Sequence, residues 1–171
     1  MKLNKKIIIA TGGTGGHVFP AYSLAQYFIK SKFDVEIITD SRGFQFLKHY
    51  KDIKFKIISS STISKKNPFS LIISFIKNIF AFLNSIVFLL KFKPDIVFGM
   101  GGYSSFPVCI ASKVLGIPFI IYENNLYLGK ANRYLLPFAK KLAVAYNSLE
   151  GINEKYSKNE GQRHTNGNTI S

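Results

Sequence analysis

The stretch KIIIATGGTGGH, residues 6–17, decides the fold of this chain. Its apolar residues run without alternation up to Thr11, which is typical of a strand buried on both faces of a sheet. Four glycines then surround Thr14, where the backbone can turn tightly and a ligand can approach the amide groups. Residues 19–31 follow with apolar side chains at helical spacing, and Pro20 is predicted to lie in the first helical turn. The stretch therefore predicts a strand, a glycine loop and a helix.

The same alternation of strands and helices continues along the chain. The expected strands after the first are 34–39, 53–59, 93–99, 117–123 and 142–147, and the expected helices are 42–51, 67–93, 105–115 and 129–141. This order indicates an α/β fold with a mostly parallel sheet and helices on both of its faces. We expect one domain over residues 1–150 and a polar tail or truncated interdomain junction over residues 151–171.

The composition narrows the class of protein. The formal net charge of +14 favours a polyanionic partner, such as nucleic acid, an anionic membrane surface or a phosphate-bearing substrate. Lysine-rich codon usage in a low-GC genome explains part of the same excess. The basic residues are scattered rather than gathered on one helix with aromatic residues, so we expect no nucleic-acid partner. A single cysteine, Cys109, excludes an internal disulfide, and no cluster of ligand residues predicts a metal site.

Three polar loops are predicted at the carboxyl edge of the sheet, where parallel α/β sheets bind their ligands. The first, residues 12–17, joins glycines to a helix start, which suits a phosphate or another anion. The second, residues 99–107, combines glycines with hydroxyl groups, and the third, residues 122–125, ends in Glu-Asn-Asn. His17 lies in the first loop, where a neutral imidazole can accept a proton from a hydroxyl. The alternative is that His17 only caps the turn, but we predict a catalytic base.

A nucleotide-binding Rossmann protein, such as an oxidoreductase, is a competing interpretation. Asp40 ends the second predicted strand, where a ribose-binding acid would sit. The dinucleotide fingerprint fails, however, because Val18 stands three residues after Gly15, where a third glycine is needed. The Walker A pattern fails because no lysine is near the glycines.

The apolar segment over residues 67–93 contains one charged side chain before Lys91, that of Lys77. It is long enough to cross a bilayer, yet it stands where parallel strands need a crossover helix. We predict that it packs on the sheet and docks to an anionic membrane surface, in preference to an ordinary core helix or a membrane span. The predicted docking residues are Phe69, Ile72, Ile73, Ile76, Lys77, Phe80 and Phe82, with Lys65 and Lys66 beside them.

The segments ATGGTGGHVFPA, KPDIVFGMGGYSSFP and GIPFIIYENN resemble, in this order, the N-terminal half of the MurG family in glycosyltransferase family 28. The resemblance implies a Rossmann-like acceptor domain, one of two that face a cleft in the GT-B arrangement. It implies an inverting N-acetylglucosaminyltransferase that moves GlcNAc from UDP-GlcNAc to lipid I, an undecaprenyl-diphosphate-linked acceptor, and so makes lipid II for peptidoglycan. It further implies no metal or cofactor, and a peripheral location on the cytoplasmic face of the bacterial plasma membrane.

The resemblance also implies roles for individual residues. His17 matches the histidine suspected of deprotonating the acceptor hydroxyl, and Asn124 departs from the family's Glu-Gln-Asn motif. The implied donor-binding residues are Thr14, Gly15, Gly16 and Asn125. The implied acceptor-diphosphate loops hold Gly12, Gly13, Gly101, Gly102, Tyr103 and Ser104.

The family chain is about twice as long as this one by domain arithmetic. Its Gly-Asn-Pro-x-Arg junction is only echoed by GNTIS at residues 167–171, with Ser171 where arginine is expected. We therefore expect no sugar transfer unless a separate chain supplies the donor domain. The alternative is a non-catalytic, membrane-anchoring subunit of a two-chain glycosyltransferase.

Overall fold

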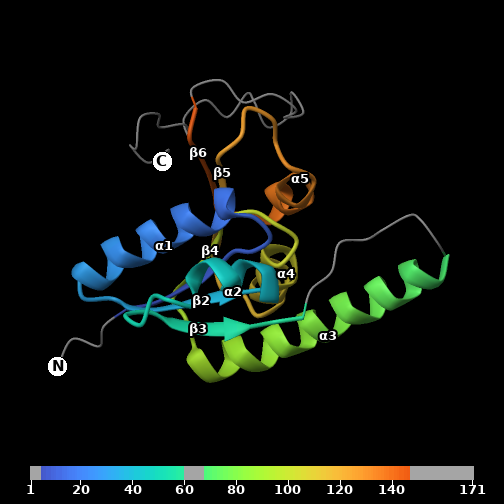
Figure 1. Ribbon diagram of the computed structural model, residues 1–171, viewed down its shortest axis with the longest axis horizontal. Helices are drawn as coiled ribbons and strands as arrows, with labels where there is room; N and C mark the ends of the chain where they lie inside the picture. The colour runs from blue at the N-terminus through green and yellow to red at the C-terminus, as the bar shows by residue number, and fades with distance from the viewer. Residues whose placement is uncertain (1–4, 60–67, 147–171) are drawn as a thin grey trace.

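The structure is a computed structural model of the chain, and it describes residues 5–59 and 68–146. Six parallel strands form one sheet in the order β3-β2-β1-β4-β5-β6 (Figure 1). The strands are β1 (Lys6–Ala10), β2 (Asp34–Thr39), β3 (Lys54–Ile57), β4 (Ile96–Gly99), β5 (Phe119–Glu123) and β6 (Lys141–Val144). The helices are α1 (Gly15–Lys30), α2 (Ser41–Leu47), α3 (Pro68–Phe92), α4 (Ser105–Val114) and α5 (Lys130–Leu135), with a short 3-10 helix, η1 (Leu136–Phe138). The predicted α/β fold is confirmed.

Strand β1 supplies both halves of the core. Ile7 and Ile9 pack with buried residues of α1 and α2, whereas Ile8 and Ala10 pack with those of α3 and α4. Figure 1 shows α1 and α3 on opposite sides of the strands. Because successive side chains of a strand point to opposite faces, a strand covered on both faces must be apolar throughout.

Helix α1 begins earlier than predicted. The N–H groups of His17 and Val18 both donate to the Thr14 carbonyl, so the helix already starts inside the glycine run at Gly15. The prediction that Pro20 lies in the first helical turn is therefore wrong, because Pro20 lies in the interior of α1. A proline in a helix interior leaves the carbonyl four residues before it without its usual donor.

Other boundaries are shorter than the sequence patterns predict. Helix α2 ends at Leu47 rather than at residue 51, and β3 ends at Ile57. The helix expected over residues 129–141 stops at Leu135 and continues only as η1, where Pro137 lacks the N–H that a longer helix needs. The division at residue 150 lies outside the described residues.

Helix α4 lies unusually close to β4. A Cβ atom on Gly99 would stand 2.6 Å from Sγ of Cys109, so glycine is what lets this helix approach the strand. The Cys109 side chain is fully buried, and this burial raises the pKa of its thiol.

Helix α3 packs on the domain along one side only. Ala81, Ser85 and Leu89 are buried, and its N-terminal half extends beyond the sheet (Figure 1). Its Leu71–Phe92 segment is long and apolar enough to cross a membrane by length and composition, and 17% of its most apolar stretch is buried. The prediction of an exposed Phe82 is wrong, because this side chain is partly buried against the core.

Candidate functional site

The three predicted loops meet at the carboxyl ends of β1, β4 and β5. Strand β1 stands between β2 and β4, so the chain leaves the sheet in opposite directions at this point and opens a crevice there. The crevice contains a pocket of about 170 Å³. Its lining residues are His17, Gly101, Gly102, Tyr103, Glu123, Asn125, Gly129, Lys130, Ala131 and Asn132.

The imidazole of His17 lies directly on the backbone of Gly101. A Cβ atom on Gly101 would stand 2.7 Å from His17 Nδ1, and Gly101 has a φ of 85°, in the left-handed region that favours glycine. Nδ1 is buried, and it has no hydrogen-bond partner in the described part of the chain. Nε2 is therefore the ring nitrogen that can exchange a proton with a ligand in the pocket.

The third loop holds the first through a side chain. Asn124 Nδ2 donates to the carbonyl oxygen of Gly16, at 2.5 Å. Gly16 stands four residues before Pro20, so this is the carbonyl that the proline leaves without a helical donor. Asn124 thus supplies the missing hydrogen bond immediately before His17.

The buried carboxylate of Glu123 organises the third loop. Its Oε1 accepts the backbone N–H of Asn125 at 3.1 Å and the side-chain amide of Asn125 at 2.7 Å. Its Oε2 accepts the N–H of Gly129 at 2.8 Å and the amide of Asn132 at 3.0 Å. Four N–H groups thus satisfy this carboxylate and fix Asn125 at the edge of the pocket.

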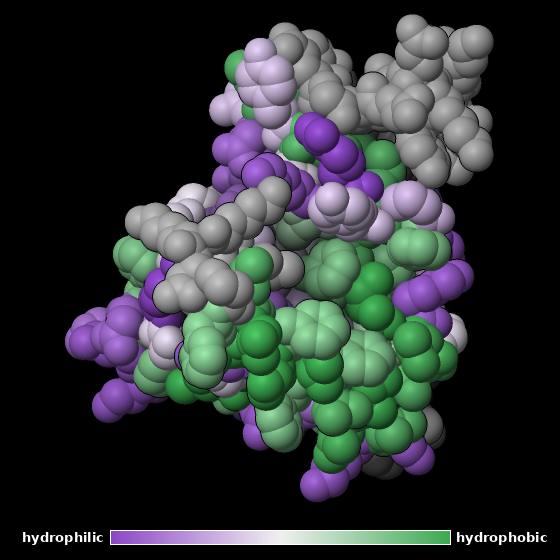
Figure 2. Space-filling view, turned by 90° about the vertical axis from the view of Figure 1, so that its right-hand side faces the viewer, coloured by the Kyte–Doolittle hydropathy of each residue, from purple (hydrophilic) through white to green (hydrophobic). Residues whose placement is uncertain are grey.

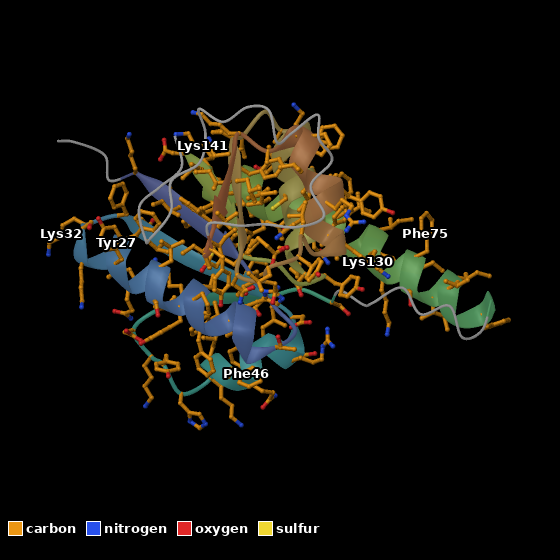
Figure 3. The ribbon with its side chains drawn as sticks, turned by 90° about the horizontal axis from the view of Figure 1, so that it is seen from above. Tyr27, Lys32, Phe46, Phe75, Lys130 and Lys141 are labelled. Atoms are coloured by element: carbon orange, nitrogen blue, oxygen red, sulfur yellow. The ribbon has the colours of Figure 1, made fainter. Side chains whose placement is uncertain are left out.

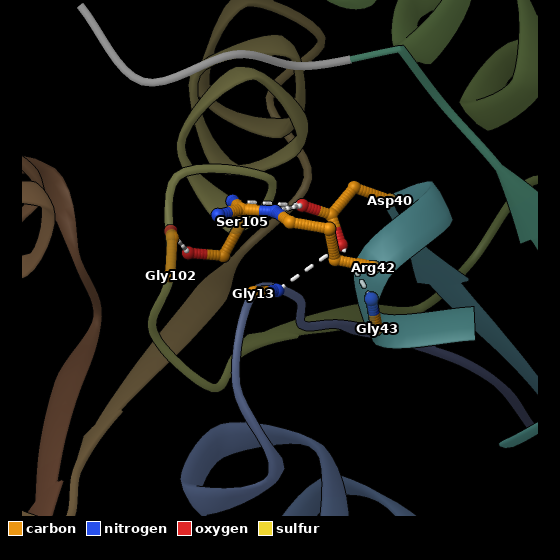
Figure 4. Close-up of polar contacts among 6 residues, drawn as sticks. All are labelled: Gly13, Asp40, Arg42, Gly43, Gly102 and Ser105. Atoms are coloured by element: carbon orange, nitrogen blue, oxygen red, sulfur yellow. Dashed lines mark hydrogen bonds and ion pairs between the residues drawn. The ribbon is translucent and has the colours of Figure 1, made fainter. Parts of the chain in front are cut away.

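A second buried carboxylate, that of Asp40 at the start of α2, binds the first loop (Figure 4). Asp40 Oδ1 accepts the N–H of Gly13 at 3.1 Å and that of Gly43 at 2.8 Å, and its Oδ2 lies 3.2 Å from a guanidinium nitrogen of Arg42. Burial by itself would raise the pKa of Asp40, but the two N–H donors and Arg42 outweigh it and lower the pKa below 3.8.

This arrangement weakens the interpretation as a nucleotide-binding Rossmann protein. Asp40 is 3% exposed and its oxygens are already bonded, so it is not free to bind a ribose. Val18, at the position of the third fingerprint glycine, is fully buried in the core.

The predicted site residues divide into two groups. His17, Gly101, Gly102, Tyr103 and Asn125 line the pocket together. The others are not part of its lining: Gly12, Gly13, Thr14, Gly15, Gly16 and Ser104.

The glycines of the first loop allow close packing of the backbone as well as the approach of a ligand. A Cβ atom on Gly12 would collide with Oγ of the buried Ser104, and one on Gly102 would collide with the Gly12 carbonyl oxygen. The two glycine loops therefore pack against each other through their backbones.

The sequence patterns did not single out Lys130 or Asn132 as site residues. Both lie at the start of α5. The one sequence feature that could have identified them is that this helix follows the polar third loop. The described residues contain no group of three side chains suited to a metal ion.

An apolar stripe runs along the exposed side of α3. At about 100° per residue, its members fall opposite the buried side chains of Ala81, Ser85 and Leu89. Figure 2 shows a broad apolar surface on this side of the molecule, and Figure 3 shows Phe75 on the projecting part of α3. We define the stripe as Phe69, Ile72, Ile73, Phe75, Ile76, Ile79, Phe80, Leu83, Val87 and Leu90, all of them exposed.

The predicted docking residues mostly belong to this stripe. Phe69, Ile72, Ile73, Ile76 and Phe80 are members, and the exposed Lys77 lies at one of its borders. Lys65 and Lys66 lie outside the described residues.

Comparison with solved structures supports the same fold. The crystal structure of MurG from Acinetobacter baumannii matches with a TM-score of 0.75 and 27% identity, over 87% of this chain and 44% of that one. A UDP-GlcNAc 2-epimerase from Methanocaldococcus jannaschii matches with a TM-score of 0.61 at 18% identity, over 88% of this chain and 44% of that one, which shows the fold alone.

Comparison with curated proteins identifies relatives that share one name, UDP-N-acetylglucosamine–N-acetylmuramyl-(pentapeptide) pyrophosphoryl-undecaprenol N-acetylglucosamine transferase. The protein from Rickettsia bellii is 36% identical over 148 residues, 86% of this chain and 40% of the relative. The protein from Pelagibacter ubique is 36% identical over 154 residues, 90% of this chain and 42% of the relative. The chain thus spans about two fifths of the length of these relatives.

The sequence pattern of the glycosyltransferase family 28 N-terminal domain matches residues 7–144, a range that contains every residue of the pocket and the whole sheet except Lys6 of β1. The chain therefore belongs to glycosyltransferase family 28, whose N-terminal domain it contains.

Proposed function

We propose that this chain provides the acceptor-binding half of a transferase that moves GlcNAc from UDP-GlcNAc to lipid I and so makes lipid II. The observation that carries the proposal is the pocket at the carboxyl edge of the sheet, where His17, Tyr103 and Asn125 come from three different loops. The relatives carry both substrates in their name, and the family pattern matches all the residues that line the pocket.

His17 is the proposed general base. A sugar hydroxyl that enters the pocket can give its proton to Nε2 as it attacks the anomeric carbon of the donor. Attack from the face opposite the leaving UDP would invert that carbon, and the reaction needs no metal. Asn125, whose amide donates to Glu123, is the proposed hydrogen-bond partner of a sugar, and Thr14, Gly15 and Gly16 are proposed to meet the donor.

The glycine loops are the proposed contact for the acceptor diphosphate. Gly101 and Gly102 have left-handed φ values of 85° and 78°, and their backbones line the pocket beside Tyr103. In the first loop, the N–H of Gly13 already donates to Asp40, so this group is not free to receive an anion.

The test is a chimera of this chain with the remaining part of the Rickettsia bellii relative. We expect it to transfer labelled GlcNAc from UDP-GlcNAc to a lipid I analogue, and this chain by itself to transfer none. The H17A chimera should lose on the order of a hundredfold or more in turnover, as expected for a lost general base. A folded chimera without transfer would overturn the proposed activity, and an H17A chimera with full turnover would overturn the role of His17.

The apolar stripe of α3 is the proposed contact with the cytoplasmic face of the plasma membrane. It runs over about 32 Å from Phe69 to Leu90, at 1.5 Å per residue. The opposite side of the helix is buried in the domain, which favours a helix lying on the membrane surface over one that crosses it. The net charge of +14 would attract anionic lipids to the same surface.

Co-sedimentation with vesicles tests this proposal. The chain should bind vesicles that contain anionic lipid, and I76E should weaken the binding strongly because it places a carboxylate in the middle of the stripe. The matched control is V114E, which exposes the same charge at the end of α4, a helix that is not part of the stripe. Equal binding by the I76E and V114E variants would contradict docking through α3.

A further inference from the structure

Lys130 is one of the residues that line the pocket at the carboxyl edge of the sheet. It is the first residue of α5, and its exposed side chain lies at the start of this helix (Figure 3). Within the described residues the ion pairs are Arg42 with Asp40 and Lys54 with Asp34, so Lys130 has no carboxylate partner there. It is also the one lysine or arginine among the described residues that line the pocket.

The carboxylate in the same pocket does not compete for this lysine. Glu123 is 1% exposed, and its two oxygens accept four N–H groups from Asn125, Gly129 and Asn132. Those donors already fill the acceptor sites of the carboxylate. The ammonium group of Lys130 therefore keeps its three N–H donors for a ligand in the pocket.

Two glycines in the pocket lining also offer hydrogen-bond donors. The backbone N–H groups of Gly101 and Gly102 make no hydrogen bond within the described part of the chain. Both glycines line the pocket, so their backbone N–H groups are available to an anion that binds there. Lys130 and the two glycines thus give one pocket a full positive charge and two free amide donors.

We propose that Lys130 binds a diphosphate in this pocket, together with the N–H groups of Gly101 and Gly102. This inference rests on the proposed function, whose two substrates both contain a diphosphate. An ammonium group suits a phosphate oxygen because it is a compact point charge with three donors.

Binding to the chain itself tests the proposal. The affinity of farnesyl diphosphate, which carries the acceptor type of diphosphate, and of UDP, which carries the donor type, is measured by calorimetry at low salt. K130A should weaken the binding about tenfold or more, because a hydrogen bond to a charged group is lost. K130R should retain most of the affinity. The matched control K30A removes the same charge from the exposed end of α1 and should bind like the wild type.

The results distinguish an acceptor diphosphate from a donor diphosphate, and they test the role of Lys130 separately from the transferase proposal. A loss for farnesyl diphosphate alone assigns Lys130 to the acceptor, and a loss for UDP alone assigns it to the donor. Equal affinities of wild type, K130A and K30A would overturn the role of Lys130 and leave the transferase proposal intact. Absence of binding by the folded wild type would overturn the diphosphate site altogether, whereas the transferase activity is decided separately by the chimera.

Discussion

The cost in stability of removing the Asn124 side chain should depend on whether residue 20 is proline. In the wild type, Asn124 Nδ2 donates to the Gly16 carbonyl because the proline cannot. In P20A the new backbone N–H at position 20 can donate to the same carbonyl. The amide of Asn124 is then one of two donors and no longer the only one.

The size of the effect follows from the exposure of the site. Gly16 is exposed, so water can reach its carbonyl in N124A, and the loss is the net value of one hydrogen bond, about 1 kcal/mol. In the P20A background, the same change should cost close to zero. The coupling free energy between the two positions is therefore about 1 kcal/mol, within the range of residues that share a partner.

Urea unfolding of the wild type, N124A, P20A and the double variant measures this cycle. The carbonyl ¹³C shift of Gly16 should move in N124A and return towards its wild-type value in the double variant. The control N84A removes an exposed asparagine from α3 and should show no coupling to Pro20. If N124A costs the same free energy in both backgrounds, Asn124 does not replace the donor that the proline lacks.

Two further perturbations test the loops. D40N should lower the unfolding free energy at pH 7 by about 1–3 kcal/mol. Because its partners lower the pKa of Asp40, the wild type should lose this stability as the pH falls below 3.8. D40N should not show this loss. Urea unfolding of both proteins between pH 2 and pH 7 measures the difference. G101A should unfold more easily than G116A: both force a left-handed φ on alanine, but only the methyl group added at position 101 meets His17, as thermal unfolding would show.

Much of the fold could be predicted because its signals are local. The apolar run before Thr11 and the glycines after it place β1 and the first loop, and the strand–helix alternation fixes the parallel sheet. The helix boundaries were less predictable. Pro20 normally marks a helix start, but here a side chain from residue 124 compensates for it, and no local pattern contains that contact.

The location of the candidate site could be predicted from the sequence, but fewer of its individual contacts could. Parallel strands bring their carboxyl ends to one edge, so the meeting of His17, Tyr103 and Asn125 followed from the order of elements. The hydrogen bond from the Gly13 N–H to Asp40 depends on how α2 returns to the sheet. The presence of Lys130 in the pocket lining depends on where α5 begins. Both contacts depend on tertiary structure, which local sequence patterns do not contain.

Because α4 packs closely on β4, the reactivity of the Cys109 thiol reports when these two elements separate. Cys109 is the only thiol in the sequence, and it is sealed between Gly99 and the core. A thiol reagent can react only when this helix separates from the strand, so the labelling rate times that event without any engineered label. The same burial protects the Cys109 thiol of the folded chain from oxidants in the surrounding solution.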